Sequence, residues 1–333
     1  MSKITKKNLL SAFKKYHLKN KESIQLVNNR IDDLPVSSNP NLLINGDFQV
    51  WQRGINFTDI QQYCADRWFF VSYANGVPLG SISKENNMLK IYNFNDKQNY
   101  IRQILEKDFS SKLAGKIVTL SVDLLADNTI DGDSIFLQIV TTQDEIFGYT
   151  NAKSHSKVIS KNEISTLSRH KLTIKIPEGT QNIAIQIGAH ESLGLLNNNA
   201  NLYISNVKLE LGSVATPFIS RSYNEELLDC KRYYEVILPY ESNGTSIDDS
   251  QSNILIKWDV EKRRIPTVSI IPDNGNVILN HYGKRIFTTS QINTTYTIIN
   301  NEIYLGLLSG FSGLTFGSSY LLGNSVTIDA EIY

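Results

Sequence analysis

The residue types that most often carry enzyme chemistry are present in this 333-residue chain, but they show no catalytic spacing. The sequence contains no phosphate-binding loop, nucleophile elbow, His-Glu-x-x-His motif or Cys/His cluster. The histidines are scattered, and none has the spacing of a metal ligand: His17, His155, His170, His190 and His281. Carboxylates are numerous, so a glycosidase-like pair is an alternative, although no motif supports it. We therefore expect neither catalysis nor a cofactor.

Two loops late in the chain carry side chains suited to binding a polysaccharide. Aromatic rings stack on the C–H faces of sugars, and Lys and Arg donate hydrogen bonds to hydroxyls or acidic sugar carboxylates. The candidate receptor contacts are Tyr282, Lys284 and Arg285 in segment 281–285, and Phe311, Phe316 and Tyr320 in the uncharged segment 306–323. An exposed apolar loop as long as the second is a liability, so burial at the axis of a trimer is the alternative for it.

The composition argues against several kinds of partner. Lys+Arg and Asp+Glu each total 33, so no net charge favours binding to nucleic acid or an anionic membrane. The N-terminal segment has no long apolar run, and we expect neither a signal peptide nor a membrane span. Cys64 and Cys230 fit no metal or redox spacing. They are expected to be small buried hydrophobic residues, with a mutual disulfide as the alternative.

Residues 1–35 are predicted to form a helical segment that joins three copies of the chain. Residues 4–34 contain no Gly or Pro, and Pro35 ends the pattern. A seam with alternating three- and four-residue spacing runs through Leu10, Phe13, His17, Asn20, Ile24, Val27, Ile31 and Leu34. β-Branched residues at both seam positions favour a bundle of three helices over two, so we expect a parallel homotrimeric coiled coil. The alternative is a pair of short helices, the second capped by Asn20.

Residues 41–222 are predicted to form a jelly-roll sandwich of two sheets. Turn clusters separate runs that read as strands: 41–44, 66–73, 88–94, 116–125, 135–141, 171–176, 182–187 and 201–211. In 183–187 every second residue is apolar, which indicates a strand with one buried face. Trp51 and Trp68 are expected to fill the core, with sugar stacking as the alternative. Asp66-Arg67 is expected to be a structural ion pair or turn.

Residues 223–333 are predicted to form a linking helix followed by a C-terminal antiparallel β-sandwich. Ser222-Tyr-Asn-Glu225 is a capping-box pattern, and it opens a helix whose apolar face carries Leu227, Cys230 and Tyr234. The expected strands are 254–260, 263–270, 276–281, 295–308 and 326–333.

Motifs at the two ends of the predicted jelly roll resemble those of bacteriophage tail fibres and related receptor-binding proteins. The first is Asn41-Leu-Leu-Ile-Asn-Gly-Asp-Phe-Gln-Val-Trp-Gln-Arg-Gly54 with Ala65-Asp-Arg-Trp68. The second is Val207-Lys-Leu-Glu-Leu-Gly-Ser-Val-Ala-Thr-Pro-Phe218, which runs on to Tyr234. Arg264-Ile-Pro-Thr-Val and Asp329-Ala-Glu-Ile are similar to the family's terminal domain. The resemblance covers residue 41 onward.

This resemblance implies a trimeric protein of the virion tail, assembled in the host cytoplasm. It implies that the N-terminal segment attaches to a tail or baseplate protein. The C-terminal domain is then expected to bind a host polysaccharide or other receptor without catalysis. The alternatives are a capsule depolymerase of a phage tail and a fibre of a contractile injection system or phage-like particle.

The opening residues also resemble those of jelly-roll carbohydrate-binding modules, some of which hold a structural calcium through two carboxylates. The matching positions here are Gln49 and Ser205-Asn206. Neither position supplies the negative charge that a hard cation needs, so we expect no metal.

Overall fold

The computed structural model describes residues 38–58, 61–72, 80–93, 98–281, 285–289, 295–299 and 303–332. The predicted N-terminal helical segment and its trimer seam lie outside these residues. The described residues from 40 onward belong to one compact unit. The prediction of a mainly β chain built from antiparallel sheets is confirmed. Within the described ranges no helix is long and apolar enough to cross a membrane.

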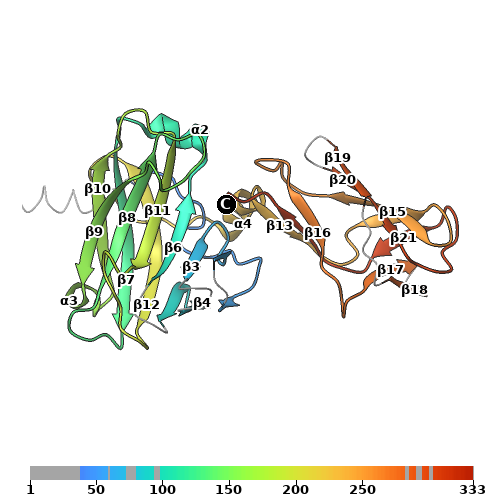
Figure 1. Cartoon of the computed structure of the whole chain (residues 1–333), viewed down its shortest axis with the longest axis horizontal. Helices are drawn as coiled ribbons and strands as arrows, with labels where there is room; N and C mark the ends of the chain where they lie inside the picture. Colours follow the sequence, from blue (N-terminus) through green and yellow to red (C-terminus); the bar gives the residue numbers. More distant parts are fainter. Residues whose placement is uncertain are drawn as a thin grey trace, which may run out of the picture. The chain divides into compact units, whose positions relative to one another are not determined.

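The first part of this compact unit is a sandwich of two six-stranded antiparallel sheets (Figure 1). The first sheet, here the β12 sheet, has the order β1 (Asn56–Phe57), β4 (Gly80–Glu85), β5 (Met88–Asn93), β12 (Asn201–Leu211), β7 (Ile117–Asp127) and β10 (Ser168–Lys175). The second sheet, here the β11 sheet, has the order β2 (Gln62–Tyr63), β3 (Phe69–Ser72), β6 (Asn99–Ile104), β11 (Asn182–Ala189), β8 (Ser134–Thr142) and β9 (Lys153–Ser160). Most neighbouring strands are distant in sequence, so long-range pairing sets both sheets.

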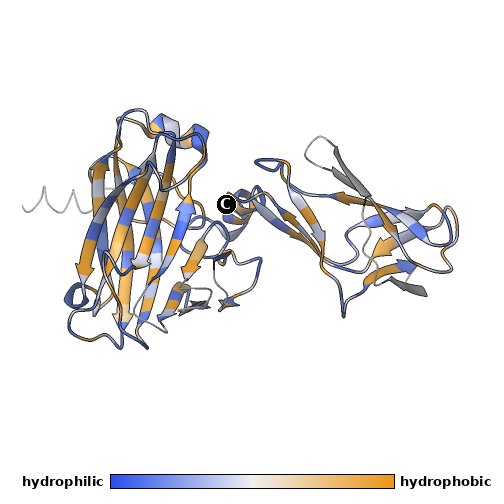
Figure 2. Ribbon diagram, viewed as in Figure 1, coloured by the Kyte–Doolittle hydropathy of each residue, from blue (hydrophilic) through white to orange (hydrophobic). Residues whose placement is uncertain are grey.

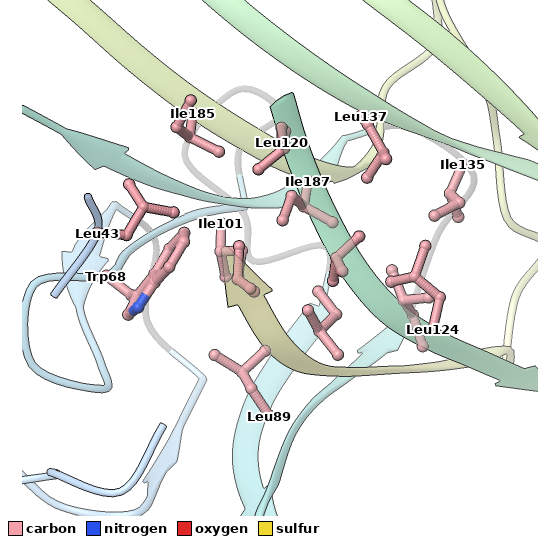
Figure 3. Close-up of a cluster of buried hydrophobic side chains, with 14 of the residues drawn as sticks. Leu43, Trp68, Leu89, Ile101, Leu120, Leu124, Ile135, Leu137, Ile185 and Ile187 are labelled. Atoms are coloured by element: carbon pink, nitrogen blue, oxygen red, sulfur yellow. The ribbon is translucent and has the colours of Figure 1, made fainter. Parts of the chain in front are cut away.

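An apolar core fills the space between the two sheets. Hydrophobic and hydrophilic residues alternate along the strands in Figure 2, and Figure 3 shows side chains from both sheets meeting in this core. In β11, Ile183, Ile185 and Ile187 face it, as their alternation predicted. Trp68 is fully buried in the same core, which confirms its prediction as a core residue, whereas Trp51 is half-buried at its edge. Burial of such large apolar side chains contributes about 1.5–3 kcal/mol each.

The opening segment 41–44 is not a strand, contrary to the prediction. The side chain of Asn41 occupies the hydrogen-bonding groups that a neighbouring strand would use. Its Nδ2 donates to the Val207 carbonyl (2.9 Å), and its Oδ1 accepts from the Leu209 amide (3.0 Å). Asn45 then takes a left-handed conformation, with φ of 56°, which ends any extended run.

The linking helix α4 (Tyr223–Lys231) begins as predicted. The Ser222 side chain accepts from the Glu225 amide, and the Glu225 carboxylate accepts in return from the Ser222 amide, which is a complete capping box. The helix ends before Tyr234, so this residue lies in a strand and not on the helix as predicted. Cys230 is buried on the helix, and both cysteines of the chain are free thiols in buried positions.

Two further antiparallel sheets complete the described chain. A three-stranded sheet has the order β13 (Tyr234–Ile237), β22 (Val326–Asp329) and β16 (Thr267–Ile270). A seven-stranded sheet has the order β18 (Arg285–Thr289), β17 (Val277–His281), β21 (Ser319–Leu322), β14 (Asn243–Ser246), β15 (Gln251–Lys257), β20 (Ile303–Ser309) and β19 (Thr295–Ile299). Short helical turns elsewhere are α2 (Lys107–Ser110), η1 (Ser111–Leu113) and α3 (Lys161–Ile164).

The uncharged segment 306–323 contributes to the core of these C-terminal sheets. Phe311 and Tyr320 are buried in the same cluster as Ile254 of β15. Burial at a trimer axis and display at a tip were the two interpretations of the sequence. For these two side chains the structure gives a third, burial within their own chain. Phe316, by contrast, is 79% exposed.

Candidate binding face of the β11 sheet

The predicted receptor contacts that the structure describes are not gathered on one surface. Tyr320 is 2% exposed, and its hydroxyl accepts a hydrogen bond from the Thr315 amide (2.9 Å). Phe311 is buried in the same cluster, so Phe316 is the one exposed side chain of these three. The remaining candidates, Tyr282, Lys284 and the side chain of Arg285, lie outside the described residues.

The outer face of the β11 sheet, which points away from the core, is partly covered by a loop of the same chain. All of β11 is buried, although only its three isoleucines and Ala189 face the core. A strand in an antiparallel sandwich commonly exposes alternate side chains to water. Here the outward residues Ala184, Gln186 and Gly188 are buried as well. The loop 143–152, which joins β8 to β9, lies against this face, because Phe147 packs on Ala184 and its cluster.

A row of side chains, here called the polar row, crosses this outer face at one level. Backbone pairing places Gln186 of β11 opposite Arg102 of β6 and opposite Gln138 of β8. Gln138 lies in turn opposite Ser156 of β9, and its Nε2 donates to the Ser156 Oγ (2.7 Å). Arg102 lies opposite Phe69 of β3. β6, β11, β8 and β9 thus contribute one polar side chain each to the row, and Phe69 of β3 lies at its end.

An aromatic pair flanks the polar row. Gly188 is paired with Tyr100 on one side and Phe136 on the other, and these two rings meet with centroids 5.8 Å apart. Strands two places apart in a sheet are about 9.5 Å apart, so the rings lean together over the glycine. A Cβ on Gly188, whose φ is +149°, would lie 2.4 Å from the Asn99 carbonyl. Only glycine fits this close backbone approach.

The loop 143–152 adds two more rings to the face. Phe147 and Tyr149 meet edge to face, with centroids 5.4 Å apart. The Tyr149 hydroxyl accepts hydrogen bonds from Arg102 Nη1 (2.8 Å) and from Gln186 Nε2 (2.5 Å). The loop is therefore attached to the centre of the polar row, while Tyr149 remains 50% exposed.

These side chains surround a hollow of about 320 Å³. It is lined by Tyr100, Phe136, Gln138, Tyr149, Ser154, Gln186, His190, Ser192 and Leu193. The lining joins ring faces to amide, hydroxyl and imidazole groups, and it includes no carboxylate. Small-ligand pockets begin at about this volume, and a few placed polar groups among apolar ones are typical of them.

Two groups in the hollow have defined hydrogen-bonding roles. The Ser192 amide donates to Nδ1 of His190 (3.2 Å), so Nδ1 is the acceptor and Nε2 carries the ring proton. Burial raises the pKa of Tyr100, so its phenol keeps its proton well above neutral pH. Nε2 of His190 therefore has a hydrogen to donate to a bound oxygen atom, whereas the phenol of Tyr100 is already hydrogen-bonded to Tyr149.

None of the residues predicted from the sequence to bind a receptor belongs to the polar row, although the sequence contains a signal for it. Gln138 and Gln186 each interrupt an apolar run, 135–140 and 183–187, at an outward position of the strand. A glutamine in such a place is either a surface residue or part of a site. Arg102 carries no comparable signal, because only the order of the strands brings it beside Gln186.

The motifs that resemble tail-fibre sequences build an internal junction. Asp66 and Arg67 are both buried, but they do not pair with each other. Asp66 accepts from the Gln52 amide (3.0 Å), whereas Arg67 pairs with Glu331 and donates to the Ile104 carbonyl (2.8 Å). Their role is structural, as predicted, and the ion pair joins the first motif to the closing Asp-Ala-Glu-Ile.

Asn45 is the centre of the first motif. Its Nδ2 donates to the carbonyls of Val50 (2.9 Å) and Asp66 (3.0 Å), and its own carbonyl accepts from the Trp68 indole (2.8 Å). Its amide donates to the carboxylate of Glu226 on α4. The opening motif, the tryptophan of the core and the linking helix are therefore held by one side chain and its backbone.

Gln49 and Asn206, which stand where a calcium site would need carboxylates, have side-chain amides that are engaged in hydrogen bonds. Gln49 Nε2 donates to the Arg221 carbonyl (3.1 Å), and Asn206 Nδ2 donates to Asp123 Oδ2 (2.7 Å). Over the described ranges, no three His, Cys, Asp or Glu side chains gather in a way that could hold a metal ion.

No family model and no curated protein matches this chain. Among solved structures, a CBM4 carbohydrate-binding module is 16% identical over 50% of this chain and 98% of its own, with a TM-score of 0.35. The CBM22-1 xylan-binding domain from Paenibacillus barcinonensis Xyn10C is 10% identical over 54% of this chain and 100% of its own, with a TM-score of 0.32. The tripod from the baseplate of bacteriophage Tuc2009 is 15% identical over 90% of this chain and 92% of its own, with a TM-score of 0.31. These similarities are too low to identify a relative.

Proposed function

We propose that this chain is a receptor-binding protein of a phage tail that binds a host-surface glycan on the outer face of the β11 sheet. The observation that carries the proposal is the hollow over the polar row. There the rings of Tyr100, Phe136 and Tyr149 stand beside the amides of Gln138 and Gln186. Sugars present C–H faces that stack on rings and hydroxyls that exchange hydrogen bonds with amides.

Binding without cleavage is the activity that this hollow supports. Hydrolysis of a glycosidic bond ordinarily uses two carboxyl groups on either side of the scissile bond. The lining of the hollow supplies ring, amide, hydroxyl, imidazole and aliphatic groups but no carboxyl group. A depolymerase is therefore the weaker proposal for this site.

The place in a tail rests on the sequence motifs at 41–68 and 207–234, which resemble those of tail fibres. In this proposal residues 1–35 form a trimeric coiled coil and attach to a tail or baseplate protein. Each hydrogen bond in a wet site contributes only about 1 kcal/mol, so a single site is weak. Three sites on one particle would raise the overall affinity through avidity.

The proposed site lies in the sandwich and not in the C-terminal loops that the sequence suggested. Tyr320 and Phe311 are buried, which leaves them little surface for a receptor. The β11 face, by contrast, gathers aromatic and amide groups around a hollow.

The test is binding of the full-length protein to an array of bacterial surface polysaccharides. The double variant Gln138→Ala/Gln186→Ala is expected to bind at least tenfold more weakly, with a melting temperature near that of the wild type. Gln251→Ala in β15, a half-buried strand glutamine outside the face, is the matched control and should bind normally. Unchanged binding by the double variant would refute the site, and release of reducing ends from a bound polysaccharide would refute the absence of catalysis.

A further inference from the structure

Arg102 has no carboxylate partner in the part of the chain that the structure describes. Its Nη1 donates to the Tyr149 hydroxyl (2.8 Å), and its guanidinium carbon lies 5.1 Å from the centre of the Phe69 ring. Its buried Nε has no acceptor among the described residues. Five other arginines each pair with at least one carboxylate: Arg53, Arg67, Arg169, Arg221 and Arg232. Arg263 resembles Arg102 in having a buried Nε without an acceptor among the described residues, but it does not line either hollow of the β11 face. Arg102 therefore places an unbalanced positive charge on the binding face.

The acidic side chains of the covering loop have other partners. Asp144 accepts from the Asn151 side chain (3.1 Å), and Glu145 pairs with Lys107. Neither neutralises Arg102.

Arg102 lines a second hollow, of about 630 Å³. The lining of this hollow includes Arg53, Phe57, Gln62, Tyr63 and Phe69, and it too contains no carboxylate. The charge of Arg53 is balanced by Asp66, Asp329 and Glu331, which lie 3.5–3.8 Å from it. Arg102 thus lines the second hollow and is joined to the first through its hydrogen bond to Tyr149, and the lining of neither hollow supplies an anion for it.

A guanidinium in this setting favours one ligand chemistry. Hydrogen bonds from a guanidinium to a carboxylate or phosphate are roughly twice as strong as neutral ones, and the planar fork of Arg donates two of them in parallel. The rings around Arg102 hold water away from part of it, so an anion there would meet less screening than at an open surface. A neutral sugar would leave the charge unmatched.

We propose that the glycan bound at this face is acidic, with a carboxylate or phosphate group held by Arg102 and adjoining sugar rings held in the hollow beside the polar row. The inference rests on the proposed function and specifies the class of ligand for the same site. Uronic acids and phosphodiester-linked glycans share the required chemistry.

The experiment compares chemically matched ligands. Acidic polysaccharides on the array are presented beside their carboxyl-reduced or dephosphorylated forms, which separates a carboxylate ligand from a phosphate ligand. The wild-type protein is expected to bind the acidic member at least tenfold more tightly, and this preference should shrink as NaCl is raised. Arg102→Gln should lose both the preference and its salt dependence. Arg169→Gln, which changes an arginine paired with Asp123 on the other sheet, is the matched control.

Each outcome decides between the two proposals. Equal binding of acidic and neutral members, or an undiminished preference in Arg102→Gln, overturns the acidic ligand; the proposed function then stands if Gln138→Ala/Gln186→Ala still loses binding. Failure of the wild type to bind any polysaccharide counts against both. If Arg102→Gln does not fold, the wild-type salt dependence decides, because a preference that is insensitive to NaCl excludes a charge pair.

Discussion

Arg67, in the turn before β3, and Glu331, just beyond β22, form an ion pair in the interior of the chain. Their side chains are 2% and 0% exposed. The guanidinium of Arg67 also lies over the ring of Tyr233, at 3.6 Å from its centre. Glu331 lies 3.5 Å from Arg53 as well, so one carboxylate balances two arginines. The pair holds the sandwich to the three-stranded sheet.

Removing this carboxylate is expected to destabilise the protein strongly. Glu331→Gln leaves a buried guanidinium without its counter-charge, which costs about 3–5 kcal/mol. Urea unfolding of the two proteins measures the difference. Glu178→Gln, which alters an exposed pair with Lys175, is the control and should cost less than about 1 kcal/mol. Equal losses in the two variants would contradict a buried junction.

Glu226 is expected to make the protein less stable as the pH rises. Burial raises the pKa of this carboxyl above its usual 4.5, despite the hydrogen bond from the Asn45 amide. The folded state then binds a proton more tightly than the unfolded state, so the favourable contribution is complete below pH 4.5 and is lost as the pH passes the raised pKa. Glu226→Gln should therefore be more stable than the wild type at pH 8, with the advantage fading toward pH 4.5. Chemical unfolding at both pH values measures it, and a variant less stable at pH 8 would contradict the assignment.

Substitutions in the sandwich and in the C-terminal loop should separate two locations for the receptor site. Tyr282→Ala/Arg285→Ala removes the ring and cation that the sequence suggested, and we expect polysaccharide binding to survive it. Tyr149→Phe removes the hydroxyl that accepts hydrogen bonds from Arg102 and Gln186. We expect this variant to bind several-fold more weakly, with a melting temperature lowered by no more than a few degrees. Tyr92→Phe on the other sheet is the control. Loss of binding in Tyr282→Ala/Arg285→Ala together with normal binding in Tyr149→Phe would instead place the receptor site in the C-terminal loop.

The N-terminal seam predicts a homotrimer. Mass measurement in solution should give about three chains per particle, in line with a β-branched seam. Ile24→Asp/Ile31→Asp would bury unpaired charges at the seam and should lower the stability of the trimer by several kcal/mol. The off-seam change Gln25→Asp/Asn29→Asp should not. A wild-type protein that is monomeric at micromolar concentration would contradict the prediction.

Strands with one apolar face were predictable, and those without one were not. β7, β11 and β12 have long alternating or apolar runs, because they are interior strands of their sheets and bury one face in the core. β9 reads Lys-Ser-His-Ser-Lys before its first apolar residue, and no pattern in it predicts a strand. It forms by pairing along its whole length with β8, at the edge of the sheet.

The candidate site was less predictable than the fold. Arg102, Gln138 and Gln186 come from β6, β8 and β11, and only the strand order places them in one row. The opening motif, in contrast, was recognisable from the sequence, because one residue in it has special structural requirements. Asn45 adopts a conformation that few residue types tolerate and makes contacts that a different side chain would not reproduce, so its local sequence is distinctive.

The ion pair between Arg67 and Glu331 also has a consequence for how the chain is made. The two residues are 264 positions apart, so a ribosome adding 5–20 residues per second needs roughly 13 to 53 s to supply the carboxylate after the guanidinium. During that interval the sandwich can assemble around most of its core but contains an arginine with no counter-charge. A nascent chain that stops before residue 331 keeps that defect permanently. Prematurely terminated products should therefore be unstable in their completed first half, which gives cellular proteases a means to remove them before they join an assembly.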